Sequence, residues 1–321
     1  MTYLKRKAPL LVAGLLAPLA GHAEFQAMDD SGLRAATGQA GITMDLSANV
    51  EIAEVAYKDQ GFIFINDLKL GGAGIAQAAL GEDVTAGTAL DNLRLTLDVA
   101  GSNQDDLGAK WGLDKLDGTA LTLTEESGDH GVTPVVIEDG DLVISLDAQD
   151  HAEGVDFGLV IDAIQLGQSG LAPGEGTNAG TSIVSGLKFK GLLGPTDIVI
   201  DEENDTMNIN AFFSLEGEVT TDFYIPILLT HKSMTFDLKM HNRRGDDVLV
   251  YTAPDGTVHS YAHIQADVGA AENDGGLRVN LTDFSTDMDW MNVGWGNNMP
   301  TIGNIYWTDL QVQADLTIYG H

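Results

Sequence analysis

Apolar and polar residues alternate along most of this chain. Over residues 42–52, every second residue is apolar and the residues between are mostly polar. This period of two places apolar side chains on one face of a strand and polar ones on the other, as in half-buried antiparallel sheets. The chain is therefore predicted to consist almost entirely of β-strands. Further alternating segments occur at 93–99, 142–146, 207–215, 234–240, 258–268, 277–281 and 310–318.

Turn residues separate these predicted strands. Asp139-Gly140 and Asp255-Gly256 supply the positive φ angle that tight hairpins need, and Glu202 to Asp205 form a third polar turn. Helix signals are sparse by comparison. Only residues 73–80 and a segment at 29–37 are expected to form short helical turns.

Two β architectures fit this pattern. The first is an all-β, mostly antiparallel sandwich or elongated rolled sheet with many hairpins. The second is an outer-membrane β-barrel, whose strands of about 9 to 11 residues also alternate. A barrel carries aromatic girdles at both membrane interfaces, whereas aromatic residues make up only 7% of this chain. The composition favours the first architecture and leaves the second as the alternative.

One short sequence recurs: a polar or small residue leads an apolar, a polar and another apolar residue. The occurrences are Asp67 to Leu70, Asn92 to Leu95, Ala163 to Leu166, Gly186 to Phe189 and Asp309 to Val312. A solenoid requires a fixed repeat length, and these examples are irregularly spaced. The recurrence therefore indicates similar strands within one long sheet.

The N-terminus has the three parts of a secretory signal peptide. Lys5-Arg6-Lys7 is basic, residues 9–19 are apolar apart from Gly14, and Gly21-His22-Ala23 offers small residues for cleavage. A membrane-spanning helix needs about 20 apolar residues, and this run is shorter. We therefore expect a signal peptide at 1–23 and one β-rich domain at 24–321. The expected location is the periplasm, outer membrane or cell surface of a Gram-negative bacterium.

The strongly acidic composition of the chain limits which partners it can bind. The chain has 48 acidic and 16 basic residues, for a net charge of -32. Such a surface repels nucleic acid and anionic lipid. The absence of cysteine excludes thiol catalysis, iron–sulfur clusters and thiolate zinc sites. The expected partners are other envelope or surface proteins, with outer-membrane association and self-assembly as options, and no nucleic acid.

No catalytic motif is recognisable in the sequence. It contains no nucleophile elbow, His-Glu-x-x-His motif, P-loop or dinucleotide fingerprint. His259 and His263, with Asp267, are the best candidates for a metal site. A strand would separate the two histidines by roughly 13 Å at about 3.3 Å per residue, too far for one ion. We predict no enzymatic activity and no cofactor, with calcium left open.

Two sets of residues are candidate sites. Polar turns supply hard oxygen ligands that suit calcium, although solvated turns are the alternative. Large aromatic residues gather near the C-terminus and form either core packing or a groove for an apolar ligand or a partner strand. The calcium candidates are Asp105, Asp106, Asp201, Glu203 and Asp205, and the aromatic candidates are Trp290, Trp295, Tyr306 and Trp307.

The segment after the predicted signal peptide resembles a known group of proteins. Met28 to Leu33, Thr37 to Leu46 and the ending Leu316 to His321 carry the resemblance. They are similar to uncharacterised exported gammaproteobacterial proteins with a TGQAGI-type N-terminal signature, some of them labelled pilus-system (Fil-type) proteins. The resemblance implies a role in the envelope or in surface assembly and assigns no catalytic residue.

Two functional classes follow. The first is an exported structural or interaction protein of the cell surface, in a pilus-like or adhesive system. The second is an outer-membrane or periplasmic binder or carrier of an apolar ligand.

Overall fold

The structure is a computed structural model. It describes residues 41–100, 121–123, 137, 140–149, 154–201, 203–225, 230–246, 248–252, 258–271, 275–296 and 300–319. By its internal contacts the chain divides into a unit of residues 1–37 and a unit of residues 38–321, and all described residues belong to the second. The predicted signal peptide at 1–23 and helical turn at 29–37 lie outside the described residues.

The described part of the chain is nearly all β, which confirms the predicted fold class. It forms one fourteen-stranded sheet with antiparallel pairings and a small three-stranded sheet. The α-helix α2 (Ala73–Leu80) has the bounds predicted from the sequence. No helix in these residues has both the length and the apolar character needed to cross a membrane. The small sheet pairs β12 (Leu249–Thr252) with β13 (Val258–Ser260) and β5 (Leu121–Leu123).

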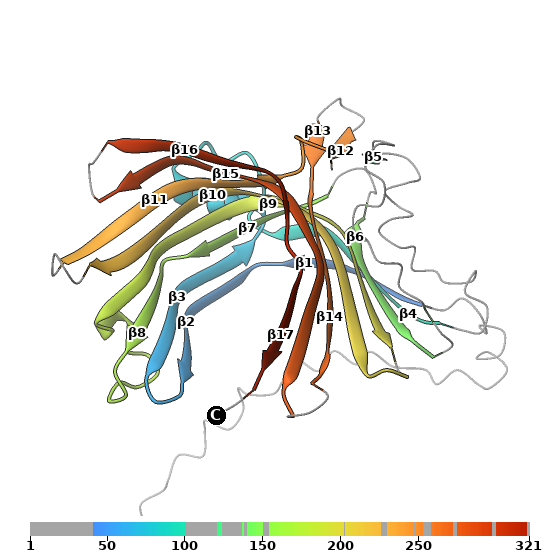
Figure 1. Cartoon of the computed structure of the whole chain (residues 1–321), viewed down its shortest axis with the longest axis horizontal. Helices are drawn as coiled ribbons and strands as arrows, with labels where there is room; N and C mark the ends of the chain where they lie inside the picture. Colours follow the sequence, from blue (N-terminus) through green and yellow to red (C-terminus); the bar gives the residue numbers. More distant parts are fainter. Residues whose placement is uncertain are drawn as a thin grey trace, which may run out of the picture. The chain divides into compact units, whose positions relative to one another are not determined.

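Three long strands run from one half of the large sheet into the other (Figure 1): β9 (Thr181–Asp201), β10 (Thr206–Ile225) and β15 (Leu277–Trp295). β9 pairs directly with β10, whereas one strand of each half separates β10 from β15. Each long strand pairs with different strands along its two parts, so the sheet has two halves. The first half runs β1 (Ile42–Ala48), β4 (Leu90–Val99), β6 (Leu142–Ala148), β9, β10, β14 (Ala262–Ala270), β15, β17 (Ala314–Ile318). The second half runs β2 (Val50–Lys58), β3 (Phe62–Gly71), the broken strand β7–β8 (Val155–Ile161 and Ala163–Gly167), β9, β10, β11 (Thr230–His241), β15, β16 (Thr301–Gln311).

Some predicted strands are divided in the structure. The alternating segment 42–52 passes from the first half to the second at Asn49, so it contributes to both β1 and β2. The segment 258–268 is likewise interrupted at Tyr261, where the chain leaves the small sheet. Of the predicted polar turn, residues 203–205 lie between β9 and β10, and Glu202 lies outside the described residues. Asp139 and Asp255-Gly256 of the other predicted turns lie outside the described residues.

Strand β10 defines the two faces of the large sheet. Its odd-numbered residues from Met207 to Val219 are apolar or glycine, and they lie on what we call the apolar face. Its even-numbered residues, such as Asn208 and Asn210, lie on what we call the polar face. Because β10 pairs with β11 in one unbroken register, the apolar face continues from the first half into the second.

The polar face is the more deeply covered one near the junction of the two halves. Helix α2 lies against this face, where the backbone N–H of Ala73 donates to Asp156 of β7 (2.9 Å). Gly158, two residues further along β7, permits this contact because a Cβ there would meet the carbonyl of Gly72. Phe212 and Tyr261, with exposed fractions of only 1% and 2%, lie beside Gly194 on the same face.

Candidate functional site

The apolar face is continuous from edge to edge in the first half. Ile209 of β10 pairs with Ile198 of β9 on one side and with Ala266 of β14 on the other. Extended in both directions, these pairings define a row to which eight strands contribute one apolar residue each. The row is Ile42, Leu97, Ile144, Ile198, Ile209, Ala266, Leu281 and Ala314. Directly opposed residues have Cβ atoms about 5 Å apart, so the row forms one apolar band.

The second half has an equivalent row. Gly217 of β10 pairs with Phe189 of β9 and with Leu238 of β11, and Leu238 pairs with Trp290 of β15. The ring of Trp290 stacks on Phe236 with centroids 4.6 Å apart. The row is Val50, Leu70, Leu159, Phe189, Gly217, Leu238, Trp290 and Ile305.

Much of this apolar face remains accessible. Ile200 is 39% exposed, Phe223 is 40% exposed and Trp295 is 42% exposed. Removing apolar surface from water stabilises a complex by about 25 cal/mol per Å². A continuous exposed apolar surface on a folded protein marks an interaction site. Burial of this face against an apolar partner would therefore stabilise the complex.

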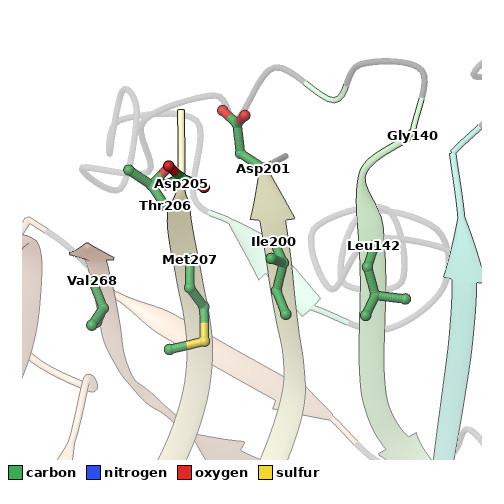
Figure 2. A pocket seen from close by; sticks show the side chains of 8 residues that line it. All are labelled: Gly140, Leu142, Ile200, Asp201, Asp205, Thr206, Met207 and Val268. Atoms are coloured by element: carbon green, nitrogen blue, oxygen red, sulfur yellow. The ribbon is translucent and has the colours of Figure 1, made fainter. Parts of the chain in front are cut away.

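A pocket of about 430 Å³ lies at one end of this face in the first half. Leu142, Ile200, Met207 and Val268 come from four adjacent strands and lie side by side within it (Figure 2). The strand pairings place them in a single row. The pocket is a shallow depression that is largely open to solvent, so a ligand there would stay in contact with the rest of the apolar face. The remaining lining residues are Gly140, Asp201, Asp205 and Thr206.

The mouth of the pocket is acidic. Asp201 and Asp205 lie at the strand ends, beyond the apolar side chains (Figure 2). The side chain of Asn204 donates to Asp201 (2.8 Å), as does its backbone N–H (2.9 Å). These hydrogen bonds lower the pKa of Asp201, so its carboxylate stays charged at neutral pH. No lysine or arginine is among the lining residues.

The calcium candidates are only partly brought together. Asp201 and Asp205 share the pocket mouth, whereas Glu203 is exposed in the turn between them. Asp105 and Asp106 lie outside the described residues. Within the part of the chain that the structure describes, no three histidine or acidic side chains are grouped so that they could hold a metal ion.

The structure does not bring the candidate metal ligands His259, His263 and Asp267 together, because His263 and Asp267 form hydrogen bonds with different partners. His263 is fully buried between Asp283 and Asn210, with both nitrogen–oxygen distances 2.6 Å. Asp267 instead accepts a hydrogen bond from Asn208 (2.7 Å). These groups lie on the polar face, where buried polar atoms need partners within the protein. His263 therefore stabilises the interior of the protein, and the structure does not join it to His259 and Asp267 in one site.

The aromatic candidates divide between the two faces. Trp290 and Trp307 pack edge to face with centroids 4.8 Å apart, and both lie on the apolar face. Trp295 lies on that face too, with its ring 5.8 Å from Phe223. Tyr306 lies on the polar face, is 57% exposed, and has Arg244 at 5.8 Å from its ring. Three of the four aromatic residues thus belong to the apolar face, while the fourth does not.

The sequence singled out Asp201 and Asp205 of the pocket mouth but not the apolar residues of the pocket. Leu142, Ile200, Met207 and Val268 each stand in an alternating or apolar segment, which indicates a strand. Only the register between β6, β9, β10 and β14 shows that these four residues form one row. β6 and β14 are far from β9 and β10 in the sequence.

Comparison with known proteins gives a partial match. Residues 1–101 match the model of a family of unknown function, DUF6160. Within the described residues this match spans β1 to β4 and helix α2, and it includes the segment 28–46 that carried the resemblance noted in the sequence. No curated protein and no solved structure matches the chain.

Proposed function

We propose that this chain binds an apolar ligand along the apolar face of its large sheet. The observation that supports this function is the unbroken, half-exposed apolar face that ends in the 430 Å³ pocket. Of the two functional classes drawn from the sequence, this geometry favours the binder or carrier. The apolar body of a ligand would lie on the row of Leu142, Ile200 and Met207.

The charges favour a ligand whose head group is neutral or cationic. Asp201 and Asp205 line the mouth, no basic residue lines the pocket, and the whole chain carries a net charge of -32. An anionic head would meet like charge at short range and from the protein as a whole. The proposal therefore excludes fatty-acid anions as the preferred ligands.

We also propose that the protein works in the cell envelope. The basic start at Lys5 to Lys7, the apolar run at 9–19 and the small residues before position 24 support export. Fractionation of the native cells tests this part independently of ligand binding. Recovery of the protein in the cytoplasm with residues 1–23 still attached would contradict it.

A matched pair of fluorescent probes tests the binding proposal. N-phenylnaphthylamine is uncharged, and anilinonaphthalene sulfonate has the same ring system with an added anionic group. Purified full-length protein should enhance the fluorescence of the uncharged probe and bind the sulfonated probe at least tenfold more weakly. The expected difference of tenfold corresponds to about 1.4 kcal/mol.

Two substitutions locate the bound probe. Ile200→Asp adds a charge to the half-exposed wall of the pocket and should weaken binding of the uncharged probe at least tenfold. Val84→Asp makes the same change at a residue that is 54% exposed and lies outside the pocket, so it should leave binding unchanged. Equal loss in both variants, or tighter binding of the sulfonated probe, would contradict the proposal.

A further inference from the structure

The two edges of the first half of the sheet are open. Within the described residues, β1 pairs only with β4 and β17 pairs only with β15. Every residue of β1 is exposed, and Ile42 is 60% exposed. On β17, Leu316 is 51% exposed and Ile318 is 58% exposed. An edge strand of this kind presents unpaired backbone N–H and carbonyl groups to another strand.

The directions of these edges are complementary. In the described part of the chain, eight strands cross the first half from β1 to β17, and each is antiparallel to its neighbour. Because eight is an even number, β1 and β17 run in opposite directions. A second copy stacked head to tail would therefore place its β1 antiparallel to β17 of the first copy, and the alternation would continue.

The charges that would block such pairing are neutralised at both edges. Asp45 is the one acidic residue of β1, and Arg94 of β4 pairs with it at 2.8 Å. Asp315 is the one acidic residue of β17, and Arg278 of β15 pairs with it at 2.9 Å. Charged side chains are one of the devices with which natural proteins protect edge strands. The whole chain carries a net charge of -32, yet the single carboxylate of each edge strand is paired with an arginine. Neither edge therefore presents an unpaired negative charge to a second strand.

From these three observations we infer that this protein assembles with further copies of itself through β1 of one copy and β17 of the next. The contact adds backbone hydrogen bonds between the sheets and continues the apolar face from one copy to the next. Because the two surfaces differ, the contact is heterologous and produces either rings or open filaments. It needs no bound ligand, so it stands apart from the ligand-binding proposal.

Sedimentation of the full-length protein, with ligand removed, tests this inference. The mean mass should rise with protein concentration and also with sodium chloride, because salt screens the repulsion between acidic copies. Arg94→Gln and Arg278→Gln expose the edge carboxylates and should each weaken association at least tenfold. Lys69→Gln removes the same charge from an exposed residue of β3 and should leave association unchanged.

Disulfide trapping tests the identity of the two edges, since the chain has no native cysteine. Thr317→Cys on β17 should form a mixed disulfide with Thr43→Cys or Ser47→Cys on β1 of another copy. Glu203→Cys, in the exposed turn between β9 and β10, should not form one with Thr317→Cys. Two results would overturn the inference: a monomer at every concentration and salt level, or cross-linking of the β1 variants to themselves as readily as to β17.

Discussion

Arg244 connects the turn after β11 to two acidic residues of β15. Its guanidinium group binds both carboxylate oxygens of Asp289, at 2.6 Å and 3.2 Å. His241 lies 3.1 Å from the same carboxylate. Asp287, which is fully buried, accepts hydrogen bonds from the backbone N–H groups of Arg243 (2.8 Å) and Arg244 (2.7 Å). His241, Arg243 and Arg244 therefore find acidic partners within the protein.

The contribution of the Arg244–Asp289 ion pair to stability should depend on pH. Burial opposes ionisation of Asp289, but hydrogen bonds from Arg244 and His241 outweigh it and lower the pKa of this carboxyl. Arg244→Met should reduce the free energy of unfolding by about 2 kcal/mol at neutral pH, because it leaves the buried carboxylate of Asp289 without its cation. The partial exposure of Arg244 keeps this loss below that of a fully buried pair. Since the folded pKa lies below the unfolded value of about 3.9, the pair stabilises the protein above that pH.

Denaturant titrations at a series of pH values from about 7 down to about 3 measure this effect, because this range brackets the unfolded pKa of Asp. The difference between wild type and Arg244→Met should be constant near neutral pH and disappear as the pH falls through the folded pKa. Arg278→Met removes an arginine from an exposed pair and should change stability little at any pH. A difference that persists in acid would show that Arg244 acts through packing.

Three of the five occurrences of the recurring sequence share a backbone feature. Asp67, Asn92 and Asp309 each lead one of them, and each has a positive φ angle, of 49°, 60° and 50°, whereas Ala163 and Gly186, which lead the other two, do not. Asp and Asn tolerate this left-handed conformation better than most residues. At Asp309 the strand also holds one more residue than its partner, as in a β-bulge. The irregular residue shifts the alternation by one, which returns the next apolar residue to the apolar face.

These positions show what could be predicted at the level of strands. Alternation predicted the strands, and the segment predicted as a helical turn, 73–80, forms α2 with the same bounds. The sequence gives no direct signal for register, because a shift of one residue at Asn92 or Asp309 decides which face the following residues occupy. The pocket row depends on such register. Alternation alone separates the consecutive residues Tyr306 and Trp307, but only the register shows which of them lies on the apolar face. The four aromatic residues could therefore be grouped by sequence but not assigned to faces.

Two glycines of the long strands differ sharply in their surroundings. Gly217 of β10 pairs with Phe189 of β9, and a Cβ there would collide with the carbonyl oxygen of Lys188. Gly186 of β9 pairs with Thr220 of β10, and a Cβ there would meet no atom within 4 Å. The close approach of β9 and β10 at Gly217 therefore depends on the absence of a side chain.

Alanine at these two positions should give opposite results. Gly217→Ala forces the two backbones apart and should lower the free energy of unfolding by about 1–3 kcal/mol, the usual cost of overpacking. Gly186→Ala should be neutral or slightly stabilising, because it restricts the unfolded chain without a clash. Chemical denaturation of both variants measures the difference. Equal stability would mean that β9 and β10 are further apart at Gly217 than the structure places them.

At the scale of the whole molecule, charge opposes the fold while backbone pairing and burial maintain it. The chain carries a net charge of -32, and repulsion between like charges destabilises a compact state. Local ion pairs such as Lys239–Glu216 (3.0 Å) offset only part of this repulsion. Screening lengths shorten from about 30 Å at 0.01 M salt to about 8 Å at 0.15 M. Added salt should therefore weaken the repulsion more than it weakens the short, partly buried ion pairs.

The thermal unfolding midpoint should consequently rise as sodium chloride increases over that range. Calorimetry at a protein concentration where the chain is monomeric separates this effect from self-assembly. A midpoint that falls with salt would mean that ion pairs contribute more than overall repulsion removes. Calcium chloride at matched ionic strength provides the further comparison, because screening alone predicts nearly the same midpoint as sodium chloride. A larger rise with calcium would instead indicate ion binding, for which Asp201 and Asp205 at the pocket mouth are the described candidates.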